Sequence, residues 1–213
     1  MSRFGTRDRI MQYPQPAIKM NNSKKKERQE RILDAALKLF TERGYFNTTV
    51  NDIQFASKMS VGSLYNYFEN KESIAVTLYS NLENCLYEAL CEIEQHNVSM
   101  HDCCYEAVRH IFENTERTPS AMQYLLYTKH REFMPVEKTA FASLPFLKMK
   151  TWVEQGQAMG EIRAMDANVA MNAIFGSAIR MVFLRIDGIL EGPLTDYLDE
   201  CWECSWRGVS SEI

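Results

Sequence analysis

The segment from Ser60 to Phe68 carries the side chains whose chemistry is most informative. Hydroxyl, amide and phenol groups can hydrogen-bond to phosphate oxygens, and short side chains on a helix can reach base edges in the DNA major groove. Leu64 and Phe68 are four residues apart and can face a core. The outer side then carries Val61, Gly62, Ser63, Tyr65, Asn66 and Tyr67. The segment thus supplies the groups that a DNA-reading helix needs, but taken without the surrounding sequence it favours ordinary packing of its aromatic residues inside a helical bundle.

Cysteines form a second group of reactive side chains. Cys201 and Cys204 are separated by two residues, which suits a redox dithiol or half of a zinc site. The spacing from this pair to His101 and Cys103 is not that of a zinc module, and the pair lies in an apolar helical segment without a βαβ pattern. We therefore expect buried cysteines that act as small hydrophobic residues, with no metal and no cofactor. A thiol-redox or metal-binding helical protein that uses Cys201 and Cys204 is the alternative.

Catalytic motifs are missing from the sequence. It has no Gly-rich phosphate loop, no HExxH pair, no nucleophile elbow and no paired carboxylates with an assignable role. We expect a protein that is not an enzyme.

The elements that must position Ser60 to Phe68 are helices, because apolar residues recur at helical spacing and no segment alternates with a period of two. An amphipathic helix is predicted over residues 24–43, closed by Gly44. Thr49 and Asp52 have capping-box spacing before a short helix that ends near residue 57, and Ser60 can cap a helix over residues 61–68. The other predicted helices cover residues 71–95, 102–116, 119–131, 146–159, 167–186 and 193–208. The fold class is therefore all-α, with about nine helices.

This arrangement resembles the TetR family of bacterial transcriptional regulators. The resemblance rests on motifs in the order and spacing of that family's DNA-binding domain: Gly44-Tyr45, Thr48-Thr49-Val50, Asp52-Ile53, Ser60, Gly62, Leu64-Tyr65, Tyr67-Phe68 and Lys71-Glu72. Two positions depart from the family pattern: Gln54 stands where Ala is frequent, and Lys58 where the turn often has Gly. A Lys in a left-handed turn costs about 1 kcal/mol and adds a cation beside the recognition helix.

The resemblance implies a division into three parts and a set of DNA contacts. Residues 1–23 form a flexible basic arm, residues 24–75 a three-helix domain with a helix-turn-helix, and residues 76–213 a helical regulatory and dimerisation domain. Phosphate contacts are implied for Thr48, Thr49, Tyr65, Tyr67 and Lys71, and base-edge contacts for Val61, Ser63 and Asn66. Lys58 and Ser60 flank the recognition helix, and Gly62 lets it approach the groove closely.

The C-terminal part is expected to hold a dimer interface and a ligand pocket. Residues 167–186 are apolar or small nearly all round, so that helix must be buried on every side. With the family's pairing of the last two helices, the expected interface residues are Ala170, Ile174, Met181, Tyr197, Leu198, Cys201 and Trp202. The residues expected to line a pocket are Tyr105, Phe112, Tyr124, Tyr127, Phe146, Met149, Trp152, Met171 and Phe175. An ordinary apolar core is the alternative for this second set.

The function implied is that of a sequence-specific transcriptional repressor. As a homodimer it would bind a pseudo-palindromic operator in double-stranded DNA, and a small hydrophobic or aromatic effector would release it. An architectural DNA binder without ligand control is an alternative, although it would not need the large apolar C-terminal part.

The charge distribution agrees with this division. The whole chain of 213 residues has a net charge of −4, which taken alone argues against nucleic-acid binding. Residues 1–75 hold 13 Lys and Arg against 8 Asp and Glu, whereas residues 76–213 hold 11 against 20. The basic half is the one that carries the helix-turn-helix. The longest charge-free stretch is 13 residues and no secretory signal is evident, so we expect a cytoplasmic protein without a membrane span.

Overall fold

The computed structural model of the protein describes residues 23–128 and 143–211. Over these residues the chain forms nine α-helices and one 3-10 helix, and the only β-type pairing is a single bridge between Ile162 and Ser210. The all-α prediction is confirmed. Residues 1–22 of the expected basic arm lie outside the described residues, as does the part of the predicted helix 119–131 beyond Thr128.

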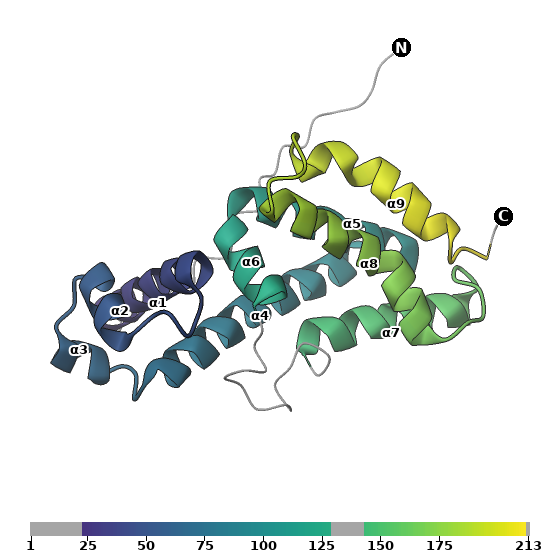
Figure 1. Ribbon diagram of the computed structural model, residues 1–213. Coiled ribbons are helices and arrows are strands. Elements are labelled where there is room, and N and C mark those ends of the chain that lie inside the picture. Colours follow the sequence, from purple (N-terminus) through teal and green to yellow (C-terminus); the bar gives the residue numbers. More distant parts are fainter. Residues whose placement is uncertain (1–22, 129–142, 212–213) are drawn as a thin grey trace, which may run out of the picture.

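Three helices form the N-terminal part, on the left of Figure 1: α1 (Ser23–Arg43), α2 (Val50–Ser57) and α3 (Val61–Tyr65). α1 ends at Gly44, whose φ of +85° is a left-handed conformation that a side chain would strain. Fully buried apolar side chains join the three helices, and they include Ile32, Ala36, Ile53 and Leu64. This small core fixes the angle at which α3 is presented.

α3 is shorter than predicted. It ends at Tyr65, with Asn66 as its C-cap, and does not continue to Phe68. Phe68 is nevertheless buried with Leu64 in the N-terminal core, so the two residues face the core as their spacing predicts. Tyr67, which directly precedes Phe68, is half-buried. The exposed part of the recognition segment is therefore one helical turn and the residues that flank it.

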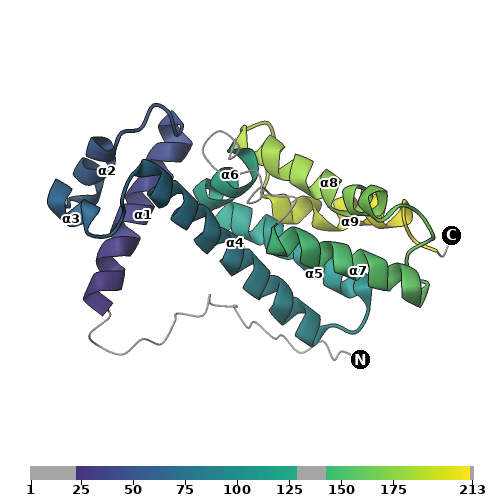
Figure 2. The same ribbon diagram turned by 90° about the horizontal axis from the view of Figure 1, so that it is seen from below.

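A single long helix, α4 (Lys71–His96), connects the two halves of the molecule (Figure 1). Its first turns bury Ile74 and Leu78 in the N-terminal core, and its last turns bury Leu90 and Ile93 in the C-terminal core. The view from below shows it running from the N-terminal helices along the rest of the chain (Figure 2). The boundary expected between residues 75 and 76 falls inside this helix, and the division into domains stays a prediction.

The C-terminal part consists of helices packed around one large apolar core. They are α5 (Met100–Arg117), α6 (Pro119–Tyr127), α7 (Leu144–Met159), α8 (Ala167–Ile186), the 3-10 helix η4 (Leu194–Tyr197) and α9 (Leu198–Arg207). The last predicted helix is thus divided into η4 and α9. Among the polar contacts that hold the helices together, Glu116 of α5 accepts hydrogen bonds from Arg185 Nε at 2.8 Å and Nη2 at 2.9 Å, and from Leu194 N at 2.9 Å.

α8 has the length and apolar composition of a helix that could cross a membrane. Its buried residues Ala170, Ile174, Ala178 and Val182 belong to the C-terminal core, where it contacts α5, α6, α7 and α9. A core helix of a helical domain has the same properties, so the composition of α8 does not by itself indicate a membrane span.

Candidate DNA-binding surface and ligand cavity

The exposed side of α3 carries the candidate DNA contacts. Ser60 is the N-cap, and its Oγ accepts a hydrogen bond from Ser63 N at 3.2 Å. Val61 is 42% exposed and Tyr65 is 52% exposed. The two residues are four apart on the helix, and neighbouring exposed apolar side chains can mark a binding surface. The other predicted contacts of this segment that are exposed are Gly62 and Asn66, whereas Ser63 and Tyr67 are half-buried.

The turn before α3 is held by side chains of α1 and α2. Lys58 adopts φ 55° and ψ 35°, which is a left-handed conformation. Among the described residues it is the only non-glycine residue with a positive φ. Gln54 Nε2 donates a hydrogen bond to Met59 O at 2.5 Å, across the turn. Arg31 Nη2 of α1 donates to Ser57 O at 2.8 Å. Lys58 itself is exposed, so its ammonium group is free to face a phosphate beside α3.

The start of α2 is closed by the capping box that the sequence predicts. Asp52 N donates to Thr49 Oγ1 at 3.1 Å, and Thr49 N donates to Asp52 Oδ2 at 2.8 Å. The Thr49 hydroxyl also donates to Asp52 Oδ2, and these hydrogen bonds lower the pKa of the Asp52 carboxyl. Thr49 is exposed, but its hydroxyl has one proton, so a hydrogen bond to a phosphate requires that proton to leave Asp52 Oδ2.

Thr48 lies in a different position from the one implied by the resemblance. Its side chain is fully buried, and its Oγ1 is within hydrogen-bonding distance of Gly44 O at 3.0 Å and of Leu39 O at 3.3 Å. The hydroxyl satisfies backbone carbonyls at the end of α1 and is turned away from the surface. Thr48 therefore positions the α1–α2 link in this structure and cannot contact a phosphate through its side chain.

The side chain of Lys71, at the start of α4, also makes hydrogen bonds within the protein. Its Nζ donates to Tyr45 O and to Thr48 O, both at 2.9 Å, and lies 4.1 Å from the centre of the Tyr45 ring. An ammonium group has three donors, so one is left for an additional partner. The contact implied for Lys71 is thus restricted to a group that approaches beside the α1–α2 link.

A cavity of about 420 Å³ lies in the C-terminal part, between α4, α5, α6, α7 and α8. Most of its wall is apolar, and the polar groups in it come from Tyr79, Glu83, Ser143 and Asn172. The apolar lining residues are Leu86, Ile111, Leu125, Leu126, Pro145, Phe146, Met149, Met171, Phe175, Gly176 and Ile179. This size and composition are typical of sites for small hydrophobic molecules.

Comparison with known proteins assigns the N-terminal helices. The sequence profile described as "Bacterial regulatory proteins, tetR family" matches residues 32–78, which include α2, α3 and the start of α4. The chain belongs to the TetR family. It is a helix-turn-helix DNA-binding transcriptional regulator, and its all-helical architecture is that of the family.

The relatives of this TetR-family chain are similar over different lengths. HbdR of Aromatoleum sp. (strain CIB), a transcriptional regulator, is 43% identical over 60 residues, which are 28% of this chain and 25% of HbdR. YvkB of Bacillus subtilis (strain 168) is 25% identical over 190 residues, 86% of this chain and 97% of YvkB. The crystal structure of a TetR-family regulator from Marinobacter aquaeolei VT8 has a TM-score of 0.78 at 18% identity, covering 89% of this chain and 98% of the other.

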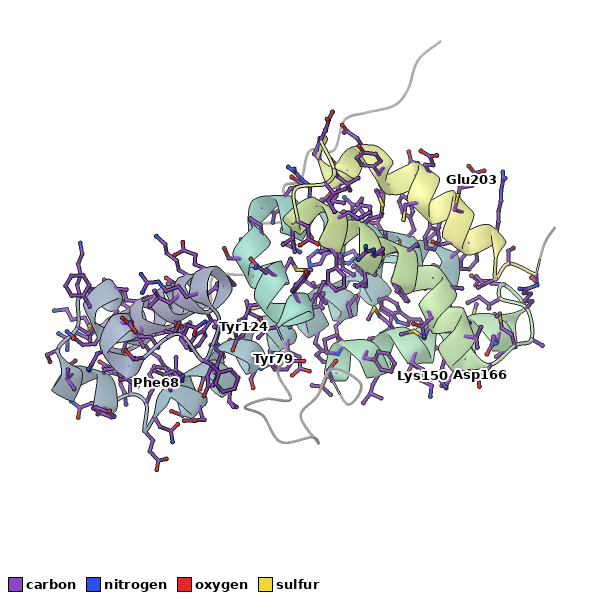
Figure 3. All side chains as sticks on the ribbon, viewed as in Figure 1. Phe68, Tyr79, Tyr124, Lys150, Asp166 and Glu203 are labelled. Carbon is purple, nitrogen blue, oxygen red and sulfur yellow. The ribbon has the colours of Figure 1, made fainter. Side chains whose placement is uncertain are left out.

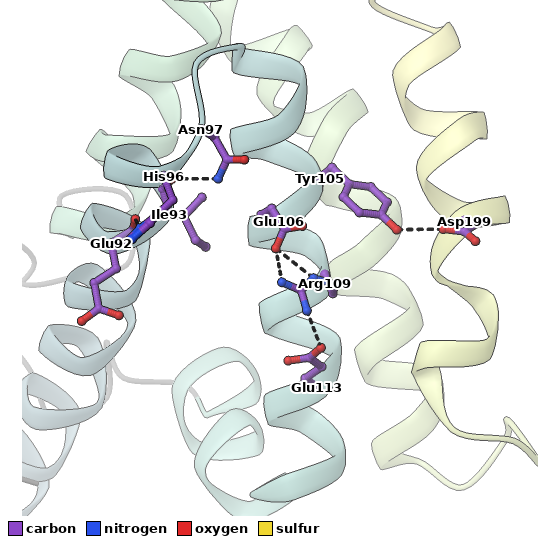
Figure 4. A network of polar contacts seen from close by, with 9 residues as sticks. All are labelled: Glu92, Ile93, His96, Asn97, Tyr105, Glu106, Arg109, Glu113 and Asp199. Atoms are coloured by element: carbon purple, nitrogen blue, oxygen red, sulfur yellow. Dashed lines mark hydrogen bonds and ion pairs between the residues drawn. The ribbon is translucent and has the colours of Figure 1, made fainter. Parts of the chain in front are cut away.

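Four of the nine residues expected at a pocket line the cavity of this TetR-family chain: Phe146, Met149, Met171 and Phe175. Tyr105 faces α9 instead, where its hydroxyl donates to Asp199 Oδ1 at 2.9 Å (Figure 4). Phe112 and Trp152 are fully buried in the C-terminal core away from the cavity, and Tyr127 is 49% exposed and packs on Phe183. These residues lie on the same helices as residues of the cavity wall, but their side chains contact other parts of the protein.

Tyr124 is the fifth expected pocket residue that does not line the cavity. It is fully buried in the N-terminal core, where its ring stacks on Phe40 of α1 and its hydroxyl donates to Ala75 O of α4 at 3.1 Å. Figure 3 shows Tyr124 close to Tyr79, where the N-terminal helices meet the rest of the molecule. Tyr124 therefore connects α6 to the DNA-binding part.

Several cavity residues were not anticipated from the sequence. Tyr79, Glu83 and Leu86 of α4 are spaced i, i+4 and i+7, and Asn172, Gly176 and Ile179 of α8 repeat that spacing. Each set borders an apolar stripe and includes a residue with a carboxylate or an amide, Glu83 on α4 and Asn172 on α8. A carboxylate or an amide beside an otherwise apolar stripe was the available signal, because such a group is costly in a core unless it serves a polar partner.

The residues expected at a dimer interface divide into two groups. Ala170, Ile174, Leu198 and Trp202 are buried in the chain's own core, because the inner sides of α8 and α9 pack against α5 and each other. Met181, Tyr197 and Cys201 are half-buried. The outer side of α8 carries Val169 and Arg180, and it is bordered by Ala173, which packs against the C-terminal core, and by Gly176, which also lines the cavity.

The cysteines of the C-terminal part lie in different surroundings. Cys103 and Cys104 are buried in α5, and burial raises the pKa of the Cys103 thiol to about 11. Cys201 is half-buried with its Sγ 3.6 Å from Ser177 Oγ, and Cys204 is exposed. Among the described residues no group of three His, Cys, Asp or Glu side chains is placed to hold a metal ion. Burial raises the pKa of Cys201 as well, which disfavours the thiolate that redox chemistry needs.

Proposed function

We propose that the protein is a homodimeric repressor that binds a pseudo-palindromic operator through α3 and is released when a small hydrophobic or aromatic molecule enters the cavity. The observation that carries this proposal is the position of the cavity. Its wall includes Tyr79 of α4 and Leu125 of α6, and these two helices also hold the DNA-binding part.

Operator reading is assigned to the exposed residues of α3 and its flanks. Tyr65, Lys58 and the free face of Lys71 supply phosphate contacts, while Val61, Ser63 and Asn66 face the base edges. A Cβ at Gly62 would meet no atom of the chain within 4 Å, so the close approach of the helix to DNA depends on the missing side chain at this position.

Dimerisation is assigned to the outer side of α8 together with the adjacent side of α9. Val169, Ala173, Gly176 and Arg180 follow one another at i, i+4, i+7 and i+11 along one side of α8, where Val169 and Arg180 are exposed and Ala173 and Gly176 are half-buried. Val169 is 56% exposed, and a Cβ at Gly176 would meet nothing within 4 Å. A two-fold axis beside this side of α8 would bring the same residues of two subunits into contact. The dimer would then present two copies of α3 to successive major grooves about 34 Å apart.

Release is assigned to a shift of α4 and α6. α6 places Leu125 and Leu126 in the cavity wall, while its neighbour Tyr124 stacks on Phe40 and hydrogen-bonds to Ala75 O. A ligand that separates α4 from α6 therefore acts on the same two helices that support α1. The ligand can change DNA affinity only to the extent that it binds the two arrangements of these helices differently.

DNase footprinting on the DNA that precedes the protein's own gene tests this function. We expect a protected site with two half-sites whose centres are one helical turn apart, together with increased transcription when the protein is removed. Regulation of this kind places the protein with the chromosome, in the bacterial cytoplasm. Binding of a single half-site by a monomer, or decreased transcription on removal, contradicts the dimeric repressor.

A further inference from the structure

Glu83 gives the cavity its charge. Among the described residues that line the cavity, it is the only one that carries a formal charge at neutral pH. It lies one turn after Tyr79 on α4, opposite the start of α7, where Ser143 and Leu144 stand. No Lys or Arg of the described part of the chain forms an ion pair with it.

The surroundings of Glu83 stabilise its carboxylate only in part. Burial raises the pKa of this carboxyl, and hydrogen bonds from the Ser143 side chain and the Leu144 backbone act in the opposite direction but are weaker. Burial and the charge of Glu83 also raise the pKa of Tyr79 to about 12. The carboxylate has about four lone-pair sites, so two hydrogen bonds leave it able to accept another partner.

The charge of the cavity decides which ligands fit. An anionic ligand would place a second negative charge beside Glu83 in an apolar environment, where repulsion is poorly screened. A cation would compensate the half-buried carboxylate, and aromatic rings such as those of Phe146 and Phe175 attract cations through their faces. The apolar remainder of the wall suits a hydrocarbon or aryl body.

We propose that the effector of this cavity is a hydrophobic cation, an ammonium-bearing molecule whose charged group pairs with Glu83 while its apolar body lies against Phe146, Met149 and Phe175. This proposal rests on the proposed function, because it names the chemical class of the molecule that releases the DNA.

Three probes of equal chain length test the charge preference on the wild-type protein: decyltrimethylammonium, decanol and decanoate, each kept below its critical micelle concentration. Calorimetric titration without DNA gives the dissociation constants. We expect the ammonium to bind at least about tenfold more tightly than decanoate, with decanol between them, since a favourable contact with a charged group is worth more than a tenfold change in affinity. Equal affinities, tighter binding of decanoate, or no binding of the ammonium contradict the proposal.

Glu83→Gln removes the charge but keeps an acceptor for Ser143 and Leu144. We expect it to weaken decyltrimethylammonium binding by about tenfold while it changes decanol binding less than twofold. Glu88→Gln is the matched control, because Glu88 is an exposed residue of the same helix and does not line the cavity. An equal loss of ammonium binding in both variants overturns the assignment. The wild-type probe series decides the question even where Glu83→Gln fails to fold.

Gel retardation with the DNA that precedes the protein's own gene separates this inference from the proposed function. We expect decyltrimethylammonium, and not decanoate, to release that DNA. If the wild-type protein binds no such DNA but shows the ammonium preference, the operator proposal fails and the charge assignment stands. If decanoate releases the DNA and the ammonium does not, the repressor proposal stands and the cation proposal fails.

Discussion

The Gln54 side-chain amide donates a hydrogen bond to the Met59 carbonyl, with 2.5 Å between the two atoms. This bond spans Lys58, which is held at a φ of 55°. The two positions that depart from the family pattern therefore lie on one turn, and the amide of one closes the turn that the other strains. The orientation of α3 depends on this pair.

Replacement of Lys58 by Gly is expected to separate stability from DNA affinity. The free energy of unfolding should rise by about 0.5 to 1 kcal/mol. Glycine relieves the left-handed backbone strain, and this gain is larger than the stability lost because glycine gives the unfolded chain more conformational entropy. The slope of log affinity against log salt should fall by about one, because one phosphate contact is lost. Urea unfolding and salt-dependent DNA titration measure the two effects. Lys58→Gln is the control, which should lower the slope and leave the strain in place.

Thr48→Val tests whether the Thr48 hydroxyl is structural. The variant keeps the shape of the buried side chain but removes the hydrogen bonds to Gly44 O and Leu39 O, so we expect a loss of about 1 to 2 kcal/mol in stability. DNA affinity of the folded protein should stay within twofold of wild type at a temperature where both are fully folded. A large loss of affinity with unchanged stability would instead assign Thr48 to phosphate binding.

The sequence predicted the helices well where local signals determine them. Gly44, the Thr49–Asp52 capping box and the Ser60 cap all lie where expected, since each depends on residues within one turn. The end of α3 was misplaced because Phe68 reaches the core from a turn, and apolar spacing cannot distinguish that turn from another turn of helix. Thr48 was assigned outward because its burial depends on α1, nine residues away.

Val169→Arg is expected to disrupt the dimer. Val169 is 56% exposed on the outer side of α8, so the single chain tolerates an arginine there, whereas two copies facing each other would bring two charges into an apolar contact. Light scattering at micromolar concentration should show a monomer with an unchanged circular dichroism spectrum. Val98→Arg, at a valine that is 90% exposed between α4 and α5, should stay dimeric. Dimers of both variants would place the interface elsewhere.

Glu116→Gln is expected to lower stability at neutral pH and to have little effect in acid. Glu116 accepts three hydrogen bonds from Arg185 and Leu194, and the contact with Arg185 lowers its pKa. The stabilisation is therefore present above the ordinary carboxyl pKa of about 4.3 and is lost as the pH falls through the lowered value. We expect a difference of about 1 kcal/mol from wild type at pH near 7 in urea unfolding, because solvent screens this partly exposed pair.

The control for this charge effect is Glu113→Gln. Glu113 pairs with Arg109 one turn away on the same helix, α5 (Figure 4), and such an i,i+4 pair contributes about 0.3 to 0.5 kcal/mol. A difference between Glu116→Gln and wild type that is the same at neutral and acid pH would contradict the ionic origin of the contribution.

The cavity could be predicted only in part from the sequence. Aromatic and Met residues of α7 and α8 indicated a site, but the same spacing also describes Phe112 and Trp152, which are plain core. Whether an apolar side chain borders a cavity or another side chain depends on the packing of five helices, which no single stripe encodes. Glu83 was not predicted either, although the sequence places its carboxylate beside the apolar stripe of α4, where a carboxylate is costly unless it has a polar partner.

The most direct test of the central claim is fluorescence anisotropy with the footprinted DNA that precedes the protein's own gene, for wild type, Tyr65→Ala and Asn66→Ala. Both residues are exposed at the end of α3 and make no core contact, so both variants should unfold at the wild-type temperature and remain dimeric. Each should lose specific binding by at least tenfold, while binding to random DNA persists at low salt. Wild-type affinity in both variants would show that α3 does not read the operator.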